Sequence, residues 1–359
     1  TTFTGKETEE PAYQGNLNAI SPAAYNNVEG LNLEPGTYIS IIGKDDSSSY
    51  WTNVKKGVMQ AADDLNKELG YKGSDKIKVT YNAPAKSEDI DEQVNILDEE
   101  LSRYPDAVGI ASIDSAACSV QFDLATANGI PIISLDSGNE YKGIQCIVKT
   151  DNEDAARTGA YKLANEIGDE GQVILVVHDS NSETAKERAK SFEEEIKNNY
   201  PSVSIVETIY CDKLDDLKKK IAVEKDPNIS EDLQKAAVEK MTDDEVMQYY
   251  LEKYPDLKGV FGTNESSTIF ALEALQKTEL AGKVALVGFD ISEEQTAAIK
   301  NGEIAGLVVQ NPFGMGYASV VAAARTVLQS GNEAVVDTGY IWVTKDNLED
   351  ESIQNMLYK

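Results

Sequence analysis

The sequence predicts an α/β protein with two doubly wound parallel-sheet lobes joined by a three-strand hinge. First, short apolar runs alternate with amphipathic segments of about 12 to 20 residues from residue 37 onward. Second, nearly the same stretch occurs twice, as YPDAVGIASIDS from Tyr104 and as YPDLKGVFGTNES from Tyr254. Third, a chain of 359 residues is long enough for roughly two domains. Together these observations indicate two similar halves.

The elements follow in order along the chain. Residues 1–36 are rich in Asn, Glu, Pro and Gly and have neither a helical nor a strand period, so they are expected to form an extended arm or a linker from an anchor. From residue 37, continuous apolar runs, each followed by a helical pattern, are typical of a parallel sheet covered on both faces. These runs are TYISIIG, IKVTY, AVGIAS, IPIISLD, GQVILVVH, SVSIVETIY, GVFGT, VALVGFD and AGLVVQ.

Two further pairs of segments extend the repeat. IPIISLDSGN matches VALVGFDIS, and IIGKDDSSSYW matches LVVHDSNSETA. We expect an N-terminal lobe of residues 37–150 and 312–339 and a C-terminal lobe of residues 151–311 and 340–359. Ligands of open α/β sheets bind beyond the carboxyl ends of the strands, so a ligand cleft is expected where the two lobes face each other.

A charged span at about residues 213–244 interrupts the second half. It predicts one or two additional surface helices, with Ser230 and Thr242 as N-caps. The acidic segment DIDEQVN from Asp89 is interpreted as a helix N-terminus and not as a calcium loop, because it lacks the turn glycine.

The composition limits the function. A formal net charge of −29 makes nucleic acid an improbable partner. Three cysteines without CxxC spacing do not suggest zinc; they are expected to be small buried hydrophobic residues, with a disulfide between Cys118 and Cys146 as the alternative. No apolar run could span a membrane, so the chain is expected to be cytoplasmic or a processed exported form.

Motifs for catalysis and cofactors are missing. The sequence has no GxGxxG, Walker, GxSxG or HExxH motif, and no cofactor is expected. The one histidine, His178, follows a predicted strand and could face the cleft as a hydrogen-bonding group. The chain is therefore expected to be a binding protein and not an enzyme.

Several segments resemble the periplasmic sugar-binding proteins of the ribose-binding type, which share their fold with the sugar-sensing core of lactose-repressor-like regulators. The resemblance covers residue 37 to the C-terminus. It lies in SYWTNVKKGV, GIPIISLDSGN, TDNEDAARTGA, ETAKERAKSF, YPDLKGVFGTNE, VALVGFD and GLVVQNP. It implies a monomeric extracytoplasmic receptor, lipid-anchored in the full-length protein, that captures a small sugar by hinge closure and delivers it to the permease of an ABC importer.

The resemblance also implies a set of ligand-binding residues. Tyr50 and Trp51 match an aromatic pair that sandwiches the sugar ring. Asp136 and Asp290 match two carboxylates that accept hydrogen bonds from hydroxyls. The other matches are a guanidinium, two amides and a lysine found in some relatives: Arg188, Asn264, Gln310 and Lys44.

Each of these residues has a structural alternative. The aromatic residues could pack a helix against the sheet, the two aspartates and Asn264 could be N-caps, Arg188 could form a helical ion pair, and Gln310 could bond within the hinge. The sequence also departs from the ribose-binding pattern, since Ser137 replaces an arginine and Ser48 an asparagine. Loss of a donor fork makes ribose itself a doubtful ligand.

Three rival functions stay open from the sequence. An effector domain of a sugar-responsive regulator would share the strands, but it needs a basic helix-turn-helix that the acidic N-terminal arm does not provide. A glycosidase would use paired carboxylates. Within the binding class, the ligand could instead be a nucleoside or a furanose-like signal.

Overall fold

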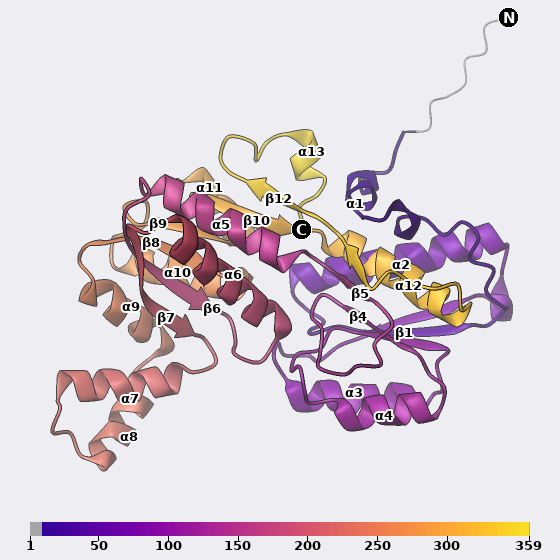
Figure 1. Cartoon of the computed structure of the whole chain (residues 1–359), viewed down its shortest axis with the longest axis horizontal. Coiled ribbons are helices and arrows are strands. Elements are labelled where there is room, and N and C mark those ends of the chain that lie inside the picture. Colours follow the sequence, from indigo (N-terminus) through magenta and orange to yellow (C-terminus); the bar gives the residue numbers. More distant parts are fainter. Residues whose placement is uncertain (1–8, 359) are drawn as a thin grey trace, which may run out of the picture.

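The computed structural model describes residues 9–358 and shows two α/β lobes side by side (Figure 1). Each lobe contains a six-stranded sheet. The sheet orders are β11-β5-β4-β3-β1-β2 and β12-β10-β9-β8-β6-β7. The predicted fold class is confirmed.

The N-terminal lobe is built on a parallel sheet in which β3 and β4 are fully buried and β1 is buried except at Tyr38. Its strands are β1 Tyr38–Ile42, β2 Lys78–Asn82, β3 Ala107–Ile110, β4 Ile132–Leu135, β5 Ile147–Lys149 and β11 Val335–Asp337. Its helices are α2 Ser49–Leu69, α3 Ile90–Leu101, α4 Ser119–Ala127 and α12 Pro312–Val327. Burial of both sheet faces explains why the strands read as continuous apolar runs.

The C-terminal lobe repeats this plan. Its strands are β6 Gly171–Val177, β7 Val203–Tyr210, β8 Leu257–Gly262, β9 Ala285–Phe289, β10 Gly306–Gln310 and β12 Tyr340–Val343, the last of which is antiparallel to β10. Its helices are α5 Asn152–Glu166, α6 Glu183–Asn199, α7 Leu214–Lys225, α8 Glu231–Lys240, α9 Asp243–Lys253, α10 Glu265–Lys277 and α11 Glu293–Lys300. A short helix, α13 Glu351–Gln354, follows β12.

The repeat is also present in hydrogen bonds. After β1, Asp45 Oδ1 accepts the amides of Ser47 and Ser48 at 3.1 and 2.9 Å. After β6, Asp179 Oδ1 accepts the amides of Asn181 and Ser182 at 2.8 and 2.7 Å. Each serine then caps the following helix. The paired segments that the sequence aligned therefore make the same turn at the carboxyl end of equivalent strands.

The chain passes between the two sheets three times, at residues 150–151, at Asn311 and at residues 338–339. The neighbouring amide side chains of Gln310 and Asn311 connect these crossings by hydrogen bonds. Thr150 Oγ1 donates to Gln310 Oε1 at 2.7 Å, and Asn311 Nδ2 donates to the carbonyl of Thr338 at 2.9 Å. The crossings therefore form one hydrogen-bonded hinge.

The N-terminal segment differs from the extended arm that its composition predicts. Residues 1–8 lie outside the described part, but residues 14–18 form α1 (Gln14–Asn18), and Leu17, Tyr25 and Leu33 are buried. Asn16 donates to Asn311 Oδ1 at 2.9 Å, so the segment contacts the hinge. Scattered apolar residues without a regular period bury this segment against the N-terminal lobe, which is why the period did not reveal it.

The charged span forms the helices that the sequence predicts. Ser230 caps α8, and Thr242 forms a capping box with Glu245 at the start of α9. α8 has no buried residue, and Figure 1 shows α7 and α8 at the outer end of the C-terminal lobe. The interpretation of this span as a solvated surface addition is confirmed for α8.

The structure also describes the cysteines, the acidic segment at Asp89 and the possible metal-binding and membrane-spanning segments. Cys118, Cys146 and Cys211 are free, so the alternative disulfide is absent. Asp89 caps α3 by accepting the amide of Glu92. Residues 9–358 contain no cluster of three or more His, Cys, Asp or Glu side chains arranged for a metal ion. Over the same residues, no helix combines the length and the apolar character needed to cross a bilayer.

Candidate functional site

A cavity of about 580 Å³ lies between the lobes, and all eight residues singled out from the sequence line it. Lys44, Tyr50, Trp51 and Asp136 belong to the N-terminal sheet and its first helix, whereas Arg188, Asn264 and Asp290 come from the other lobe. Gln310 is the last residue of β10, directly before the second crossing. The carboxyl ends of both sheets therefore meet at one cavity, as open α/β sheets require.

Asp136 and Asp290 occupy equivalent positions directly after β4 and β9. Both have left-handed backbone conformations, with φ of 62° and 68°. Such values are uncommon for residues other than glycine, although aspartate is among the residues that adopt them more often, and they turn the side chain away from the strand direction. Neither aspartate is the N-cap of the following helix, since Ser292 caps α11 and Cys118 and Asp151 precede the helices flanking Asp136.

Asp136 is held by two side chains of its own lobe. Tyr50 Oη donates to Asp136 Oδ1 at 2.7 Å, and Lys44 Nζ lies 3.3 Å from Oδ2. Both carboxylate oxygens therefore have a fixed orientation toward the cavity that they line. Lys44 compensates one negative charge of the N-terminal wall.

Asp290 is held by three donors. Gln310 Nε2 and Tyr358 Oη each donate to Oδ1 at 2.7 Å, and the amide of Glu265 donates to Oδ2 at 3.2 Å. Burial raises the pKa of Asp290, while the charge of Arg188 and these side-chain hydrogen bonds oppose the rise. Oδ1 carries both side-chain donors, so Oδ2 is the oxygen with more capacity left for a ligand.

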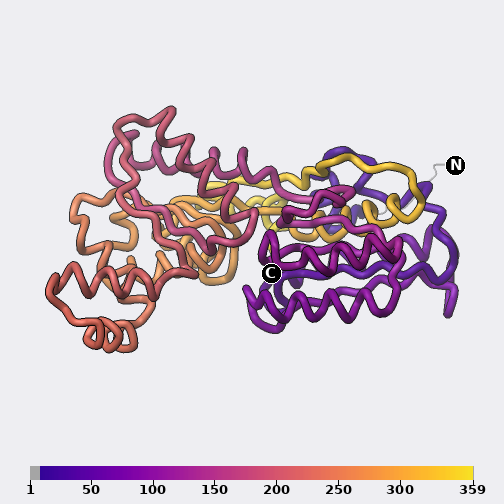
Figure 2. Tube along the Cα trace, turned by 60° about the horizontal axis from the view of Figure 1, so that its bottom comes forward, coloured from indigo at the N-terminus to yellow at the C-terminus, as the bar shows by residue number. Residues whose placement is uncertain are grey.

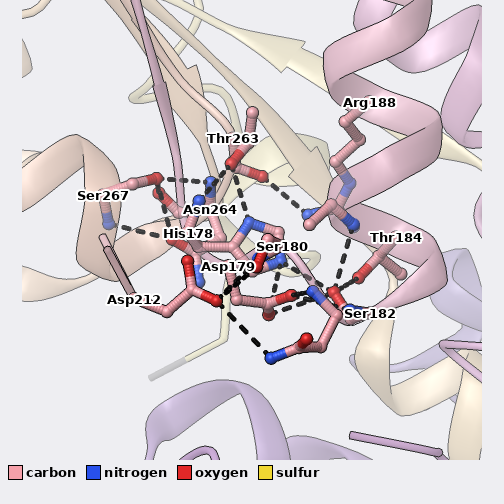
Figure 3. A network of polar contacts seen from close by, with 12 residues as sticks. His178, Asp179, Ser180, Ser182, Thr184, Arg188, Asp212, Thr263, Asn264 and Ser267 are labelled. Atoms are coloured by element: carbon pink, nitrogen blue, oxygen red, sulfur yellow. Dashed lines mark hydrogen bonds and ion pairs between the residues drawn. The ribbon is translucent and has the colours of Figure 1, made fainter. Parts of the chain in front are cut away.

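Arg188 is buried and stacks its guanidinium 4.3 Å from the ring centre of Phe289. Its Nη1 donates to the carbonyl of Thr263 at 2.7 Å (Figure 3). Its Nε donates to Asn152 Oδ1 at 2.9 Å, and its Nη2 donates to Gln310 Oε1 at 3.0 Å. The predicted alternative, an exposed helical ion pair, is wrong for this buried side chain. A guanidinium has five N–H donors, so capacity remains for a ligand.

Gln310 connects the site to the hinge. Its Oε1 accepts from Thr150 and Arg188, its Nε2 donates to Asp290, and Tyr50 Oη lies 3.4 Å from its Oε1. The amide is therefore occupied by protein groups from both lobes and the first crossing. It acts in this conformation as an organiser of the site.

The aromatic pair differs in geometry from the sandwich that the resemblance implies. The ring centres of Tyr50 and Trp51 are 5.2 Å apart with planes at 73°. Two rings in edge contact leave no slot between them for a sugar ring. Phe270 of α10 lines the same cavity from the other lobe, so Trp51 and Phe270 are the aromatic side chains available on its two walls.

Asn264 and His178 lie side by side beyond β8 and β6 (Figure 3). Asn264 Oδ1 caps α10 by accepting the amide of Ser267 at 2.8 Å, which leaves its amide nitrogen as the group for a ligand. His178 Nδ1 lies 2.7 Å from Thr263 Oγ1. Burial lowers the pKa of His178, with help from the charge of Arg188, so the ring is neutral near pH 7.

Sequence reasoning missed several lining residues. Asp45 and Asp179 were visible in the aligned repeat but serve as turn formers, and Phe270 was hidden within a helical apolar pattern. Glu265 lies in the first turn of α10, where burial, followed by the charges of Asp290 and Asp45, raises its pKa to about 7. No local signal marks such a residue, because its environment comes from other segments.

The two lobes touch across the mouth of the cleft. The amide of Ser115 in the N-terminal lobe donates to the carbonyl of Asn181 at 3.3 Å. Lys186 Nζ on α6 donates to Ser115 Oγ at 3.2 Å. Nearer the hinge, Lys149 of β5 pairs with Glu187 of α6 at 3.1 Å. These contacts indicate a closed arrangement of the lobes.

A sequence model of the periplasmic binding protein domain family matches residues 39–332. The chain belongs to this family. Membership confirms the expectation of an extracytoplasmic solute-binding protein of the ABC-importer class and not an enzyme, and it removes the glycosidase alternative. The matched range includes the eight predicted site residues.

Similar proteins are named for sugars and polyols. The ribose import binding protein of Bacillus subtilis is 23% identical over 278 residues, which are 77% of this chain and 77% of that protein. A xylitol-binding protein of Mycolicibacterium smegmatis is 22% identical and covers 85% of this chain and 76% of its own.

Solved structures show the same fold. A carbohydrate transporter solute-binding protein from Agrobacterium radiobacter, in complex with D-arabinose, has a TM-score of 0.73 and 28% identity over 89% of this chain and 98% of its own. A solute-binding protein from Agrobacterium vitis with bound D-fucose has a TM-score of 0.72 and 26% identity, over 89% and 100% of the two chains.

Proposed function

We propose that this protein captures a small uncharged sugar in the cavity between its lobes and delivers it to the permease of an ABC importer. One observation carries the proposal: two fixed carboxylates, Asp136 and Asp290, line one cavity together with Arg188 and with the aromatic side chains Trp51 and Phe270. Carboxylates and a guanidinium bind the hydroxyl rim of a sugar, and aromatic faces bind its C–H surface. The sugar complexes of the similar solved structures support this choice of ligand class.

The charge of the cavity argues against anionic ligands. Its acidic lining residues are Asp45, Glu88, Asp136, Asp179, Glu265, Glu273 and Asp290, against the two cations Lys44 and Arg188. Such a lining repels sugar phosphates and uronic acids. Ribose remains a poor candidate, because Ser137 is buried, does not line the cavity and provides no donor fork.

Binding would proceed by hinge closure. Residues 37–150 with 312–339 and residues 151–311 with 340–359 would rotate as two bodies about the three crossings, and the ligand would shift the population to the closed state. We further propose that the protein acts as a monomer and is held outside the cytoplasmic membrane, in the periplasm or at the cell surface, by a lipid anchor in its full-length form. The permease would then recognise the closed form of the protein.

A thermal-shift screen tests the proposal. The purified protein is heated with pentoses, hexoses, deoxysugars, inositols and nucleosides, since a ligand that binds only the folded state raises Tm. We expect one class of neutral sugar to raise Tm strongly, and Asp136→Ala and Trp51→Ala to abolish that shift, with affinities at least about 100-fold weaker by calorimetry.

Glu293→Ala, at an exposed position in the first turn of α11, is the matched control and should keep the full shift. A shift with nucleosides alone would replace the sugar assignment by the nucleoside alternative. Absence of any shift across the panel would contradict sugar binding at this cavity.

A further inference from the structure

The segment that follows β12 returns to the space between the lobes. Leu348 is buried, α13 follows, and the chain then runs to Tyr358, which is only 3% exposed. Both views place this yellow segment at the junction of the two lobes (Figures 1 and 2). The hydroxyl of a tyrosine that is almost fully buried normally has a hydrogen-bond partner. The partners of Tyr358 therefore matter for the site.

Tyr358 contacts the candidate site from both sides. Its hydroxyl donates to Asp290 Oδ1 at 2.7 Å in the C-terminal lobe. Its ring makes an edge contact with Tyr50 of the N-terminal lobe, with centres 5.5 Å apart and planes at 88°. Burial, together with the charge of Asp290, raises the pKa of the Tyr358 hydroxyl well above its ordinary value, so this group remains a donor at every physiological pH.

The hydrogen bond between Tyr358 and Asp290 resembles the one between Tyr50 and Asp136 in the N-terminal lobe. Tyr50 Oη donates to Asp136 Oδ1 at 2.7 Å, as Tyr358 Oη does to Asp290 Oδ1. The aligned repeat puts Thr184 at the position of Tyr50, and Thr184 Oγ1 instead lies 3.2 Å from Ser182 Oγ within its own turn. The duplicated segment of the C-terminal lobe thus contains no tyrosine for Asp290, and the segment after β12 supplies one.

We propose that Tyr358 is a positioning residue of the ligand site, which orients the Asp290 carboxylate for the ligand, and that the segment after β12 therefore contributes to the site through this one side chain. The inference rests on the proposed function. Tyr358 and Gln310 together occupy Oδ1 and prevent rotation of the carboxylate, so that Oδ2 is presented to the cavity. The edge contact also supports the ring of Tyr50, which holds the other carboxylate.

Tyr358→Phe tests the proposal, because it keeps the ring and removes only the hydroxyl. We expect the affinity for the sugar found in the thermal-shift screen to fall about tenfold or more, measured by calorimetry at pH 7.5. Tyr317→Phe is the matched control: Tyr317 is 2% exposed and its hydroxyl donates to Asp64 at 2.6 Å, but neither residue lines the cavity. It should leave the affinity within about twofold.

The pH profile separates positioning from a general loss of structure. The charged and titratable groups that act on Asp290 are Arg188, Asp136, Glu265, Tyr50 and Tyr358. Without the Tyr358 hydroxyl the pKa of Asp290 rises further, so the carboxylate is neutralised at a higher pH. The pH at which affinity falls to half its plateau should move upward by about one unit in Tyr358→Phe and stay unchanged in Tyr317→Phe.

Unchanged affinity and an unchanged pH profile in Tyr358→Phe, with sugar binding intact in the wild type, would overturn the inference alone. If the wild type binds no sugar, the proposed function fails, and the positioning of Asp290 is tested by urea unfolding of Tyr358→Phe, Asp290→Ala and the double variant, because alanine removes the oxygen that accepts from Tyr358. A double variant no less stable than Asp290→Ala supports the link between the two side chains; additive losses overturn it.

Discussion

At the scale of single residues, the acidic lining of the cavity should reduce the stability of the folded protein. Glu265 and Glu88 line it, and burial, followed by the charges of neighbouring carboxylates, raises the pKa of each to about 7. Lys44 and Arg188 are the cations of the lining. The unliganded site therefore stores electrostatic repulsion, which hydrogen bonds from a ligand can relieve.

Glu265→Gln should change the pH dependence of stability. An acid whose pKa is raised in the folded state stabilises the fold below about pH 4.3, its unfolded value, and loses that contribution as the pH rises through about 7. The wild type should therefore lose stability between pH 5 and pH 8, and the variant should lose less. After allowance for solvent screening, we expect the variant to be more stable at pH 8 by about 1 kcal/mol in urea unfolding.

Glu293→Gln provides the comparison, because Glu293 opens α11 as Glu265 opens α10 but is exposed. It should change stability by less than about 0.5 kcal/mol and by a similar amount at both pH values. Equal slopes for the wild type and Glu265→Gln would contradict the account of the acidic cavity.

At the scale of elements, α2 and α12 of the N-terminal lobe pack in direct backbone contact. A Cβ on Gly316 would lie 2.0 Å from the carbonyl oxygen of Val54, and one on Gly57 would lie 1.9 Å from that of Phe313. These distances are far below van der Waals contact, so the helix backbones touch through both glycines. The contact fixes α2, whose first turn carries Tyr50 and Trp51, against the helix that follows the hinge.

Gly316→Ala should destabilise the protein by about 3 kcal/mol, because a methyl group there must push two helix backbones apart. Urea unfolding by circular dichroism measures the loss. Gly15→Ala is the control, since its Cβ would lie 3.8 Å from the nearest atom, Met356 Cγ, and it should not destabilise the protein, because alanine forms helices better than glycine does. A folded Gly316→Ala protein of wild-type stability would be the contradictory result.

At the scale of the whole molecule, the contacts across the cleft mouth predict a ligand-dependent change of shape. Lys186 Nζ donates to Ser115 Oγ of the opposite lobe at 3.2 Å, and opening of the proposed hinge would break this contact. Lys186→Ala should therefore weaken sugar binding about threefold without changing the stability of the unliganded protein. Small-angle X-ray scattering should show a smaller radius of gyration with sugar than without it.

Lys190→Ala is the matched control on the same helix, because Lys190 pairs with Glu194 of its own helix at 3.9 Å and is exposed. It should leave the affinity unchanged. An identical radius of gyration with and without a bound sugar would argue against hinge closure.

Most of the fold, and the main residues that line the cavity, could be predicted from the sequence. Strands buried on both faces are largely apolar, so β1, β3, β4, β6 and β9 could be predicted from the sequence. Ligands bind at the carboxyl ends of such strands, and this rule pointed to the residues that follow them. The residues after β4 and β9, Asp136 and Asp290, line the cavity as expected. The helix N-caps Ser230 and Thr242 could also be predicted, because capping depends only on residues that are neighbours in the sequence.

The tertiary structure alone decided what each side chain does there. Local patterns could not show that Leu17, Tyr25 and Leu33 of the N-terminal segment are buried, that Tyr50 and Trp51 meet edge to edge, or that Gln310 bonds to Thr150, Arg188 and Asp290. Nor could they show that Tyr358 reaches Asp290, 68 residues away in the chain. Periodicity and caps depend on neighbours in sequence, whereas hydrogen-bond partners, ring geometry and pKa values depend on groups that only folding brings together.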